Sequence, residues 1–345
     1  MRPKQKVKLK DIADSLGVSV VTVSNSLAGR PGVSAEMRTK IKECAAKMGL
    51  DYSKYGKTTP KKVENPELIG KTISVIVSDR YIYIGASFYW EMYQKVAYAV
   101  SENECFTSLS MVKDYDDDEI LPPVTDADGV IIIGPIKEKF LNRLLAAVKV
   151  PVVFMDQQIE TGNYTSVLSG NYYGMYRATK ELVKAGHKEI GFVGALDYSR
   201  NIIDRYYGYK KCMRENGLKV NREWLLPDRS GNDETPMIEL PKKLPTAFAC
   251  SSDFSAGLLY EVLKKQGKRV PEDISIVGYD NYLLNSDLEG RLTTYNVDLV
   301  KMARLTVEQV INEIEDPSLA GTIFEVDSNV VKRTSIKELR DNNAE

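Results

Sequence analysis

The sequence predicts a small three-helix domain followed by a larger α/β domain of two lobes. Three features predict it: helical spacing of apolar residues over residues 8–50, a reversal of net charge after residue 62, and short apolar runs that alternate with longer helical patterns from residue 71 onward. A chain of 345 residues with 43% hydrophobic side chains can bury more than one core, so at least two domains are expected.

The first domain is predicted to contain a helix-turn-helix. Gly17 supplies the turn between the first two helices, and the Ser19 hydroxyl can cap the second by accepting an amide hydrogen bond. This order of helix, glycine-containing turn and helix is that of a DNA-reading motif. The expected helices are 9–16, 20–28 and 35–48, and the expected core residues are Ala13, Leu16, Val18, Val23 and Leu27.

The charge of the chain is divided unevenly. Residues 1–62 contain fourteen Lys or Arg and five acidic residues, a net charge of +9, whereas the remainder carries −10. Phosphate neutralisation needs clustered cations, so only the first domain is expected to meet a polyanion such as DNA. The charge alone is also compatible with a solvated Lys-rich tail, and the helices alone with a purely structural subdomain.

The second helix is the candidate for reading base pairs. Exposed valines suit contact with thymine methyl groups, and Asn25 can pair with an adenine edge. Ser19 and Thr22 are better placed to hold phosphates. The residues expected on or near the exposed face are Val20, Val21, Ser24 and Asn25.

The second domain alternates strand and helix patterns, which is typical of βαβ units and a largely parallel sheet. About eight strands are too many for one small sheet, so two lobes with a cleft between them are expected. The predicted strands are 72–77, 106–112, 129–133, 152–155, 190–193, 246–250 and 274–278, and the predicted helices include 88–103, 172–185, 205–216 and 254–266.

Polar side chains follow several predicted strands directly. Ligands bind at the carboxyl ends of strands in open α/β sheets, so these side chains are candidates for the cleft. Carboxylates can accept hydrogen bonds from sugar hydroxyls or base amines, and Arg205, at the expected start of a helix, can offer a fork of donors. Capping of neighbouring helices is the competing explanation, and the favoured one for Asp253. The candidates are Asp156, Ser252, Asp253 and Asp280.

Residues 81–90 are unusually aromatic and lie just beyond the first predicted strand. Phe88 and Tyr89 are candidates for stacking on a ligand ring. Helical core packing or a subunit interface explains an aromatic cluster equally well.

The N-terminal motif resembles that of the lactose-repressor (LacI/GalR) family of bacterial transcription regulators. Leu9-Lys-Asp-Ile-Ala, Gly17-Val-Ser, Thr22-Val-Ser, Val33-Ser and Arg38 match in order and spacing. The resemblance implies a homodimer that binds double-stranded palindromic operator DNA, and it adds Leu9, Val33, Ser34 and Arg38 to the residues expected at the DNA.

The second domain extends the resemblance over most of the chain through Gly186–Gly194, Arg205-x-x-Gly-Tyr209, Ser252-Asp253, Ile276–Asp280 and Leu292-Thr-Thr. The implied fold is periplasmic-binding-protein-like, with two lobes joined by three crossovers. The implied ligand is a small-molecule effector that controls operator affinity allosterically. A sugar or sugar derivative is expected first, and a nucleoside or purine second. Arg205 and Asp280 match the family's most recurrent ligand contacts, followed by Asp156 and Ser252, with an aromatic side chain near Phe88 or Tyr89.

The segment after the first domain departs from the family pattern. The family carries a hinge helix whose Leu inserts into the minor groove, but Tyr52 stands here at its Pro position and Thr59 at its Leu position. Intercalation of the usual kind is therefore not expected. Lys54 and the neighbouring lysines are expected to hold phosphates or the minor groove instead, and Tyr55 is a candidate substitute wedge.

Other functional classes lack their motifs in this sequence. It contains no G-x-S-x-G elbow, P-loop or metal-ligand cluster, so no enzyme, cofactor or metal is expected. The four cysteines are scattered and are expected to be reduced. A solute-binding protein of a sugar or nucleoside uptake system is the alternative function. The lack of an export signal and of long apolar runs argues against it and indicates a cytoplasmic protein without membrane contact.

The domain boundaries predicted from these features are residues 1–50 for the helix-turn-helix domain, 51–69 for a linker and 70–340 for the effector domain. The effector domain is divided into an N-lobe of about 70–160 and 296–325 and a C-lobe of about 161–295 and 326–340. No leucine heptad follows Ile336, so a dimer without a coiled-coil tetramer is expected.

Overall fold

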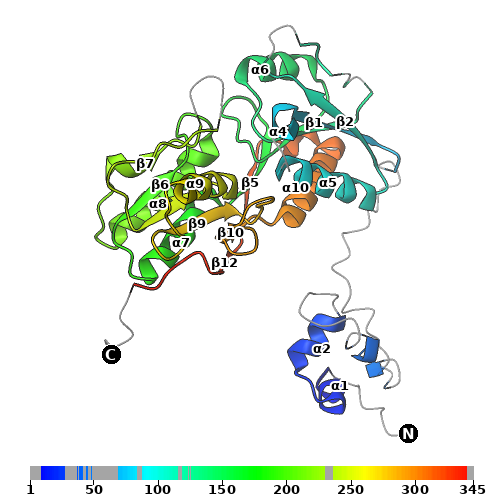
Figure 1. The fold of residues 1–345 in the computed structure, drawn as a ribbon. Coiled ribbons are helices and arrows are strands. Elements are labelled where there is room, and N and C mark those ends of the chain that lie inside the picture. The colour runs from blue at the N-terminus through cyan, green and yellow to red at the C-terminus, as the bar shows by residue number, and fades with distance from the viewer. Residues whose placement is uncertain are drawn as a thin grey trace. The chain divides into compact units, whose positions relative to one another are not determined.

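The computed structural model describes residues 9–27, 37, 39–41, 44–45, 48, 69–83, 88–115, 119–122, 124, 126–229 and 236–339, without the side chains of residues 10, 21, 24, 25, 27, 82 and 83. The chain forms two compact units, residues 1–67 and 68–345. Figure 1 shows the elements of each unit. Among the described residues no helix is long and apolar enough to cross a membrane.

The first unit contains the two helices of the predicted motif, α1 (Leu9–Leu16) and α2 (Val20–Leu27). Gly17 turns the chain between them with a φ of 63°, a conformation that glycine adopts without steric cost. Residues 37, 39–41 and 44–45, from the predicted third helix, are helical. The core consists of Ile12, Ala13, Val23, Ile41 and Ala45, with Leu9, Leu16, Val18, Met37 and Cys44 packed against it.

The second unit contains two six-stranded sheets. The first sheet is parallel, with the order β11-β5-β4-β3-β1-β2. Helices α5 and α10 lie side by side on it (Figure 1), and α6 packs through Phe140, Leu141 and Leu144 against a core that includes Ile76 and Phe154. The elements are β1 (Thr72–Ser78), α4 (Arg80–Tyr83), α5 (Phe88–Glu102), β2 (Phe106–Val112), β3 (Gly129–Ile133), α6 (Glu138–Ala147), β4 (Val152–Met155), β5 (Thr165–Ser169), α10 (Leu299–Glu315) and β11 (Ile323–Val326).

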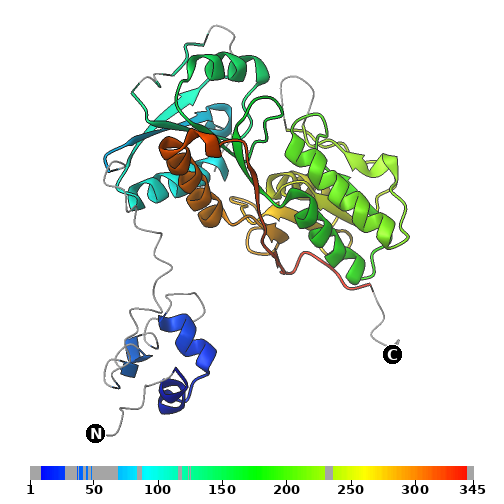
Figure 2. The same ribbon diagram turned by 180° about the vertical axis from the view of Figure 1, so that it is seen from behind.

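The second sheet has the order β12-β10-β9-β8-β6-β7, and only β12 runs antiparallel to its neighbour. Figure 2 shows α7 and α8 packed together beside this sheet, and α9 contacts β6, β8 and β9. The elements are α7 (Asn171–Lys184), β6 (Ile190–Val193), α8 (Arg200–Glu215), β7 (Leu225–Leu226), β8 (Ala247–Cys250), α9 (Asp253–Lys265), β9 (Ser275–Asp280), β10 (Thr293–Asn296) and β12 (Val330–Val331). Short 3₁₀ turns span Arg222–Trp224 and Pro317–Leu319.

These observations confirm the predicted fold class and correct one lobe boundary. The chain passes between the sheets at residues 169–171, 296–299 and 326–330. The predicted boundary at residue 161 is wrong, because β5 pairs with β4 in the first sheet. Thr165 and Ser169 bury hydroxyl groups in this strand, so it lacks the apolar run by which the other central strands are predicted.

A second correction concerns the helix that carries Arg205, which begins at Arg200 rather than at Arg205. Ser199 caps it by accepting a hydrogen bond from the Ile202 amide. The β-branched pair Ile202 and Ile203 disfavours a helix by local propensity, but burial of Ile202 in the folded lobe outweighs this preference. Arg205 therefore lies in the second turn of the helix, with Asn201 one turn before it.

Candidate functional site

Helix α2 presents part of the predicted DNA-reading surface. Val20 is 43% exposed, an unusual position for a valine in a short helix. Ser19 caps the helix, since its Oγ accepts the Thr22 amide at 3.0 Å and lies 2.8 Å from Thr22 Oγ1. Leu9 is half-buried against the helical core. The side chains of Val21, Ser24 and Asn25, and the residues Val33, Ser34, Arg38, Lys54 and Tyr55, lie outside the described part of the chain.

The second unit contains a cavity of about 400 Å³ lined by side chains that follow strands of both sheets. The six residues predicted for the effector site all line it: Phe88, Tyr89, Asp156, Arg205, Ser252 and Asp280. The carboxyl ends of parallel strands thus help to bring residues more than 190 positions apart in the sequence into one cavity.

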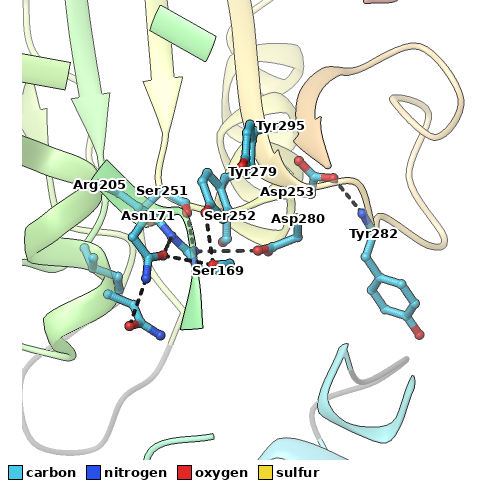
Figure 3. Close-up of polar contacts among 12 residues, drawn as sticks. Ser169, Asn171, Arg205, Ser251, Ser252, Asp253, Tyr279, Asp280, Tyr282 and Tyr295 are labelled. Carbon is cyan, nitrogen blue, oxygen red and sulfur yellow. Dashed lines mark hydrogen bonds and ion pairs between the residues drawn. The ribbon is translucent and has the colours of Figure 1, made fainter. Parts of the chain in front are cut away.

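Arg205 is the central cation of this cavity and is 6% exposed. Its Nε donates to Asn171 Oδ1 at 2.7 Å and its Nη1 donates to the Ser251 carbonyl at 2.8 Å. The Asp280 carboxylate lies 3.6 Å from Nη1, as an ion pair, and the guanidinium carbon stacks 3.8 Å from the centre of the Tyr279 ring. Figure 3 shows Arg205 held between Asn171 and Asp280. These contacts with the protein therefore fix the orientation of the guanidinium.

Asp156 is buried directly after β4 and connects the two sheets. It accepts hydrogen bonds from the Tyr89 hydroxyl at 3.1 Å and from Asn201 Nδ2 at 3.0 Å. Burial raises the pKa of Asp156 to about 6, although Arg205, Tyr89 and Asn201 each lower it. A carboxyl group with this pKa changes its charge within the range of pH found in cells.

Asp280 ends β9 on the other side of Arg205. Burial, reinforced by the carboxylates of Asp253 and Asp156, raises the pKa of Asp280 well above its ordinary value, against the lowering effect of Arg205. Its φ of 117° is a conformation that side-chain-bearing residues rarely adopt. Backbone strain of this kind persists only where surrounding structure fixes it, and it is frequent at ligand sites.

Ser252 caps helix α9, because its Oγ accepts the Ser255 amide at 3.0 Å. The expectation that Asp253 acts mainly as a cap is wrong. Asp253 accepts from the Thr294 hydroxyl at 2.6 Å and from the Tyr282 amide at 2.8 Å, so it fastens the segment after β9 to β10. Tyr282, held in this way, brings its ring to 5.8 Å from that of Phe88 in the other lobe.

Several further residues of the cavity are absent from the sequence prediction. Asn201 could have been found from its helical spacing to Arg205, had the start of the helix been placed correctly. The others lie in loops or in the first turns of α4 and α9 and belong to no motif, so only tertiary packing brings them to the cavity. They include Arg80, Tyr81, Tyr198, Arg229, Phe254 and Tyr282.

The described residues contain no group of three potential metal ligands. The four cysteines are free, as expected, and Cys105, Cys212 and Cys250 are buried. His187, the single histidine of the sequence, is buried and contacts Thr246 Oγ1 at 2.9 Å, outside the cavity.

The architecture and site define a regulator class: a helix-turn-helix unit together with a two-sheet unit that encloses a small-molecule cavity. Comparison with known proteins supports this class. Residues 8–52 match the model of bacterial regulatory proteins of the lacI family, and residues 179–336 match the periplasmic binding protein-like domain. The chain thus combines a helix-turn-helix domain of the lacI family with a periplasmic-binding-protein-like domain, and it is a DNA-binding transcription regulator with a small-molecule effector domain.

Relatives of similar length support this assignment. The HTH-type transcriptional repressor PurR of Photobacterium profundum is 26% identical over 96% of this chain and 99% of its own length. The ribose operon repressor of Haemophilus influenzae is 27% identical over 96% and 99%. The crystal structure of the lac repressor dimer bound to operator and the anti-inducer ONPF shares the fold, with a TM-score of 0.60, 21% identity and coverage of 96% and 100%. These proteins agree with the predicted regulator and not with a solute-binding protein of an uptake system.

Proposed function

We propose that this chain is a repressor whose affinity for its operator is set by a sugar or sugar derivative bound around Arg205. The observation that carries the proposal is the buried arrangement of one guanidinium with two carboxylates, Asp156 and Asp280, at the carboxyl ends of strands from different sheets. A protein that reads chromosomal DNA in this way acts in the bacterial cytoplasm.

The chemistry of the cavity favours a hydroxylated ligand. Asp156 and Asp280 can accept hydrogen bonds from vicinal hydroxyls while Arg205 donates to ring or hydroxyl oxygens. The rings of Phe88 and Tyr89 supply apolar faces on which the C–H faces of a sugar can pack. Because both sheets contribute, a ligand bound here favours one relative position of the lobes over another.

We further propose that the regulator acts as a homodimer on a palindromic operator. Sheet edge strand β2 and helix α5 expose large apolar side chains, namely Phe106, Met111 and Tyr98. An uncovered edge strand with such side chains is suited to association with a second subunit. Two copies of α2 would then place Val20, Val21, Ser24 and Asn25 in neighbouring major grooves, with Ser19 and Thr22 at phosphates.

A ligand panel tests the effector assignment. Sugars, nucleosides and purines are screened by thermal shift, and positive compounds are titrated by calorimetry and then added to operator-binding measurements by fluorescence anisotropy. We expect a sugar to raise the melting temperature and to change operator affinity. A purine or nucleoside that does so while sugars do not would overturn the sugar assignment.

A variant pair ties the response to Arg205. Arg205→Lys keeps the charge but loses the planar fork, and it should weaken effector binding at least about tenfold while operator binding without effector is retained. Arg304→Lys is the matched control, because Arg304 forms an exposed ion pair with Glu102 at 3.1 Å away from the cavity. Equal effector affinities in both variants would remove Arg205 from the site.

A further inference from the structure

The cavity extends beyond the residues that surround Arg205. A volume of about 400 Å³ lies within the range of about 300–1,000 Å³ of pockets that hold drug-sized ligands. A single sugar ring is smaller than such a ligand and leaves part of this space empty. The remaining lining residues include Arg80, Tyr81, Tyr198 and Arg229, together with Pro236. We call these five residues the distal group.

Contacts between side chains connect the residues around Asp156 and Arg205 to the distal group. The Tyr89 hydroxyl donates to Asp156, and the Tyr89 ring lies 4.5 Å from that of Tyr81. The hydroxyls of Tyr81 and Tyr198 are 3.4 Å apart, and the Arg229 guanidinium stacks 3.9 Å from the centre of the Tyr198 ring. This series of contacts therefore links Asp156 to Arg229 through three tyrosines.

Each guanidinium of the distal group is held by a buried carboxylate. Arg229 donates to both oxygens of Asp228, at 3.1 and 2.9 Å, and the Asp228 side chain is fully buried. Arg80 donates to Asp114 at 3.0 Å, and Asp114 also accepts from the Ser78 hydroxyl and the Lys137 amide. Burial would raise the pKa of Asp228, but Arg229, Ser255 and Ala195 outweigh it and hold this pKa below its ordinary value. Arg229 and Asp228 thus form a pair without net charge, and Arg80 forms an ion pair with the buried Asp114.

This chemistry distinguishes between classes of ligand. An anionic group would gain little from guanidinium groups that are already neutralised by buried carboxylates. A neutral hydroxylated ring needs hydrogen-bond donors and an aromatic face, and the distal group supplies both through Arg229, Tyr81 and Tyr198. The two lobes contribute together, because Tyr81 belongs to α4 and Tyr198 follows β6.

We propose that the distal group is a second sugar subsite, so that the effector is a neutral oligosaccharide of at least two units, one at Arg205 and one against Arg229 and the Tyr81–Tyr198 pair. This inference rests on the proposed sugar response. It adds that discrimination between one ring and two is made by Tyr198 and Arg229, whereas Arg205, Asp156 and Asp280 bind the first unit.

Calorimetric titration of the full chain tests the subsite. The probes are maltose, cellobiose, lactose, sucrose and xylobiose, each compared with its component monosaccharides. We expect at least one disaccharide to bind about tenfold or more tightly than its components. Monosaccharides that bind as tightly as every disaccharide would overturn the subsite but leave the sugar response standing. Failure of every sugar to bind would overturn the proposed function itself.

Variants separate the two ends of the cavity. Tyr198→Ala removes the aromatic face but leaves the Arg229–Asp228 pair in place, so folding should be preserved. It should weaken disaccharide binding about tenfold and monosaccharide binding by less than about twofold. Arg229→Lys, which keeps a cation beside Asp228, should act in the same direction. The matched control is Tyr207→Ala, because Tyr207 is an exposed tyrosine of α8 outside the cavity.

Equal losses for both ligand sizes in Tyr198→Ala would overturn the proposal. Tighter binding of a disaccharide phosphate or an acidic disaccharide than of its neutral counterpart would also overturn it, since the neutral Arg–Asp pairs would then not define the ligand class.

Discussion

Asp156 and Asp280 occupy equivalent positions in the two sheets. Leaving aside β11 and β12, both sheets have the same strand order, and β4 corresponds to β9. Asp156 follows β4 and Asp280 ends β9, and both adopt positive φ, 64° and 117°. Arg205 experiences the charge of both carboxylates, which raise the pKa of its guanidinium despite burial. The Arg205 end of the cavity is thus built by the same strand end of each sheet, although the sequence shows no repeat.

The first prediction concerns pH. The pKa of Asp156 is about 6 in the folded protein and about 3.9 in an unfolded chain. Because folding raises this pKa, the protonated carboxyl stabilises the ligand-free fold below about pH 4, and this contribution is lost as pH rises through 6. The contribution is at most on the order of 3 kcal/mol. Folding also raises the pKa of Asp253, to about 7, and that of Asp280. Both groups therefore lower the free energy of unfolding as pH rises, and they extend the pH range of this decrease above 6.

Urea denaturation across this pH window measures the effect. The free energy of unfolding of the ligand-free protein should fall as pH rises, and Asp156→Asn should show a shallower decrease because the amide does not titrate. Asp287→Asn is the control, since Asp287 is exposed and Lys264 lowers its pKa. A slope in Asp156→Asn equal to that of the unmodified protein would contradict the assignment.

The second prediction concerns the connection from the cavity to the crossovers. Asn171 lies at the first crossover and accepts from Arg205 Nε at 2.7 Å, while its Nδ2 donates to Asn201 at 3.1 Å. Tyr279, under the Arg205 guanidinium, donates to Ser169 of the same crossover and stacks 4.9 Å from Tyr295. Figure 3 shows this group. Tyr295 in turn donates to Asp327 of the third crossover at 3.0 Å.

Asn171→Ala should therefore reduce the ratio of operator affinities measured with and without effector. Allosteric coupling is typically about 1–3 kcal/mol, so the loss should be severalfold in this ratio. Operator binding by anisotropy, at saturating effector, measures it. Lys211→Ala, which removes an exposed ion pair with Glu215 on α8, should leave the ratio unchanged. An unchanged ratio in Asn171→Ala would rule out this route of coupling.

The third prediction concerns the packing of α7 against α8. A Cβ at Gly208 would lie 2.0 Å from the Tyr172 carbonyl oxygen, a contact that the rigid backbone cannot relieve. Gly208→Ala should therefore lower the free energy of unfolding by about 1–3 kcal/mol. Gly257→Ala is the matched helical control, because its Cβ would meet side-chain atoms alone, the flexible end of Leu283 at 3.2 Å and Ser286 Oγ at 3.9 Å. Equal free energies of unfolding for the two variants would contradict this prediction, because α7 and α8 would then move apart at this contact without loss of stability.

The fourth prediction concerns residues 51–59, where the sequence departs from the family hinge and which lie outside the described residues. We propose that Tyr55 substitutes for the missing apolar wedge. Tyr55→Ala should then reduce both operator affinity and the bend angle of the DNA, while the salt dependence contributed by Lys54 and its neighbours persists. Affinity and bend angle are measured by gel mobility shift with permuted operator fragments. If both are unchanged, the wedge hypothesis is rejected.

Local sequence information was sufficient for most of the central strands and for the polar residues that follow them. Central strands such as Gly129–Ile133 are buried on both faces and therefore appear as uninterrupted apolar runs, and their bounds match the prediction. The polar residues that follow such strands, including Asp156 and Asp280, can be recognised because chain direction alone places them at one edge of a parallel sheet.

Tertiary structure decided what local patterns do not encode. The polar strand Thr165–Ser169 joins the first sheet by backbone pairing with β4 and β11, a long-range contact that its own residue pattern does not indicate. The distal group comes from four loops and helices far apart in sequence, and no periodicity relates Tyr81 to Tyr198. The sequence by itself placed Asp156 and Asp280 at the carboxyl ends of strands, because strand direction is local, and it identified Arg205 through a motif shared with the family. The depth of the cavity, the fixed orientation of Arg205 and the link from Asn171 to the crossovers depend on long-range packing, which only the folded chain specifies.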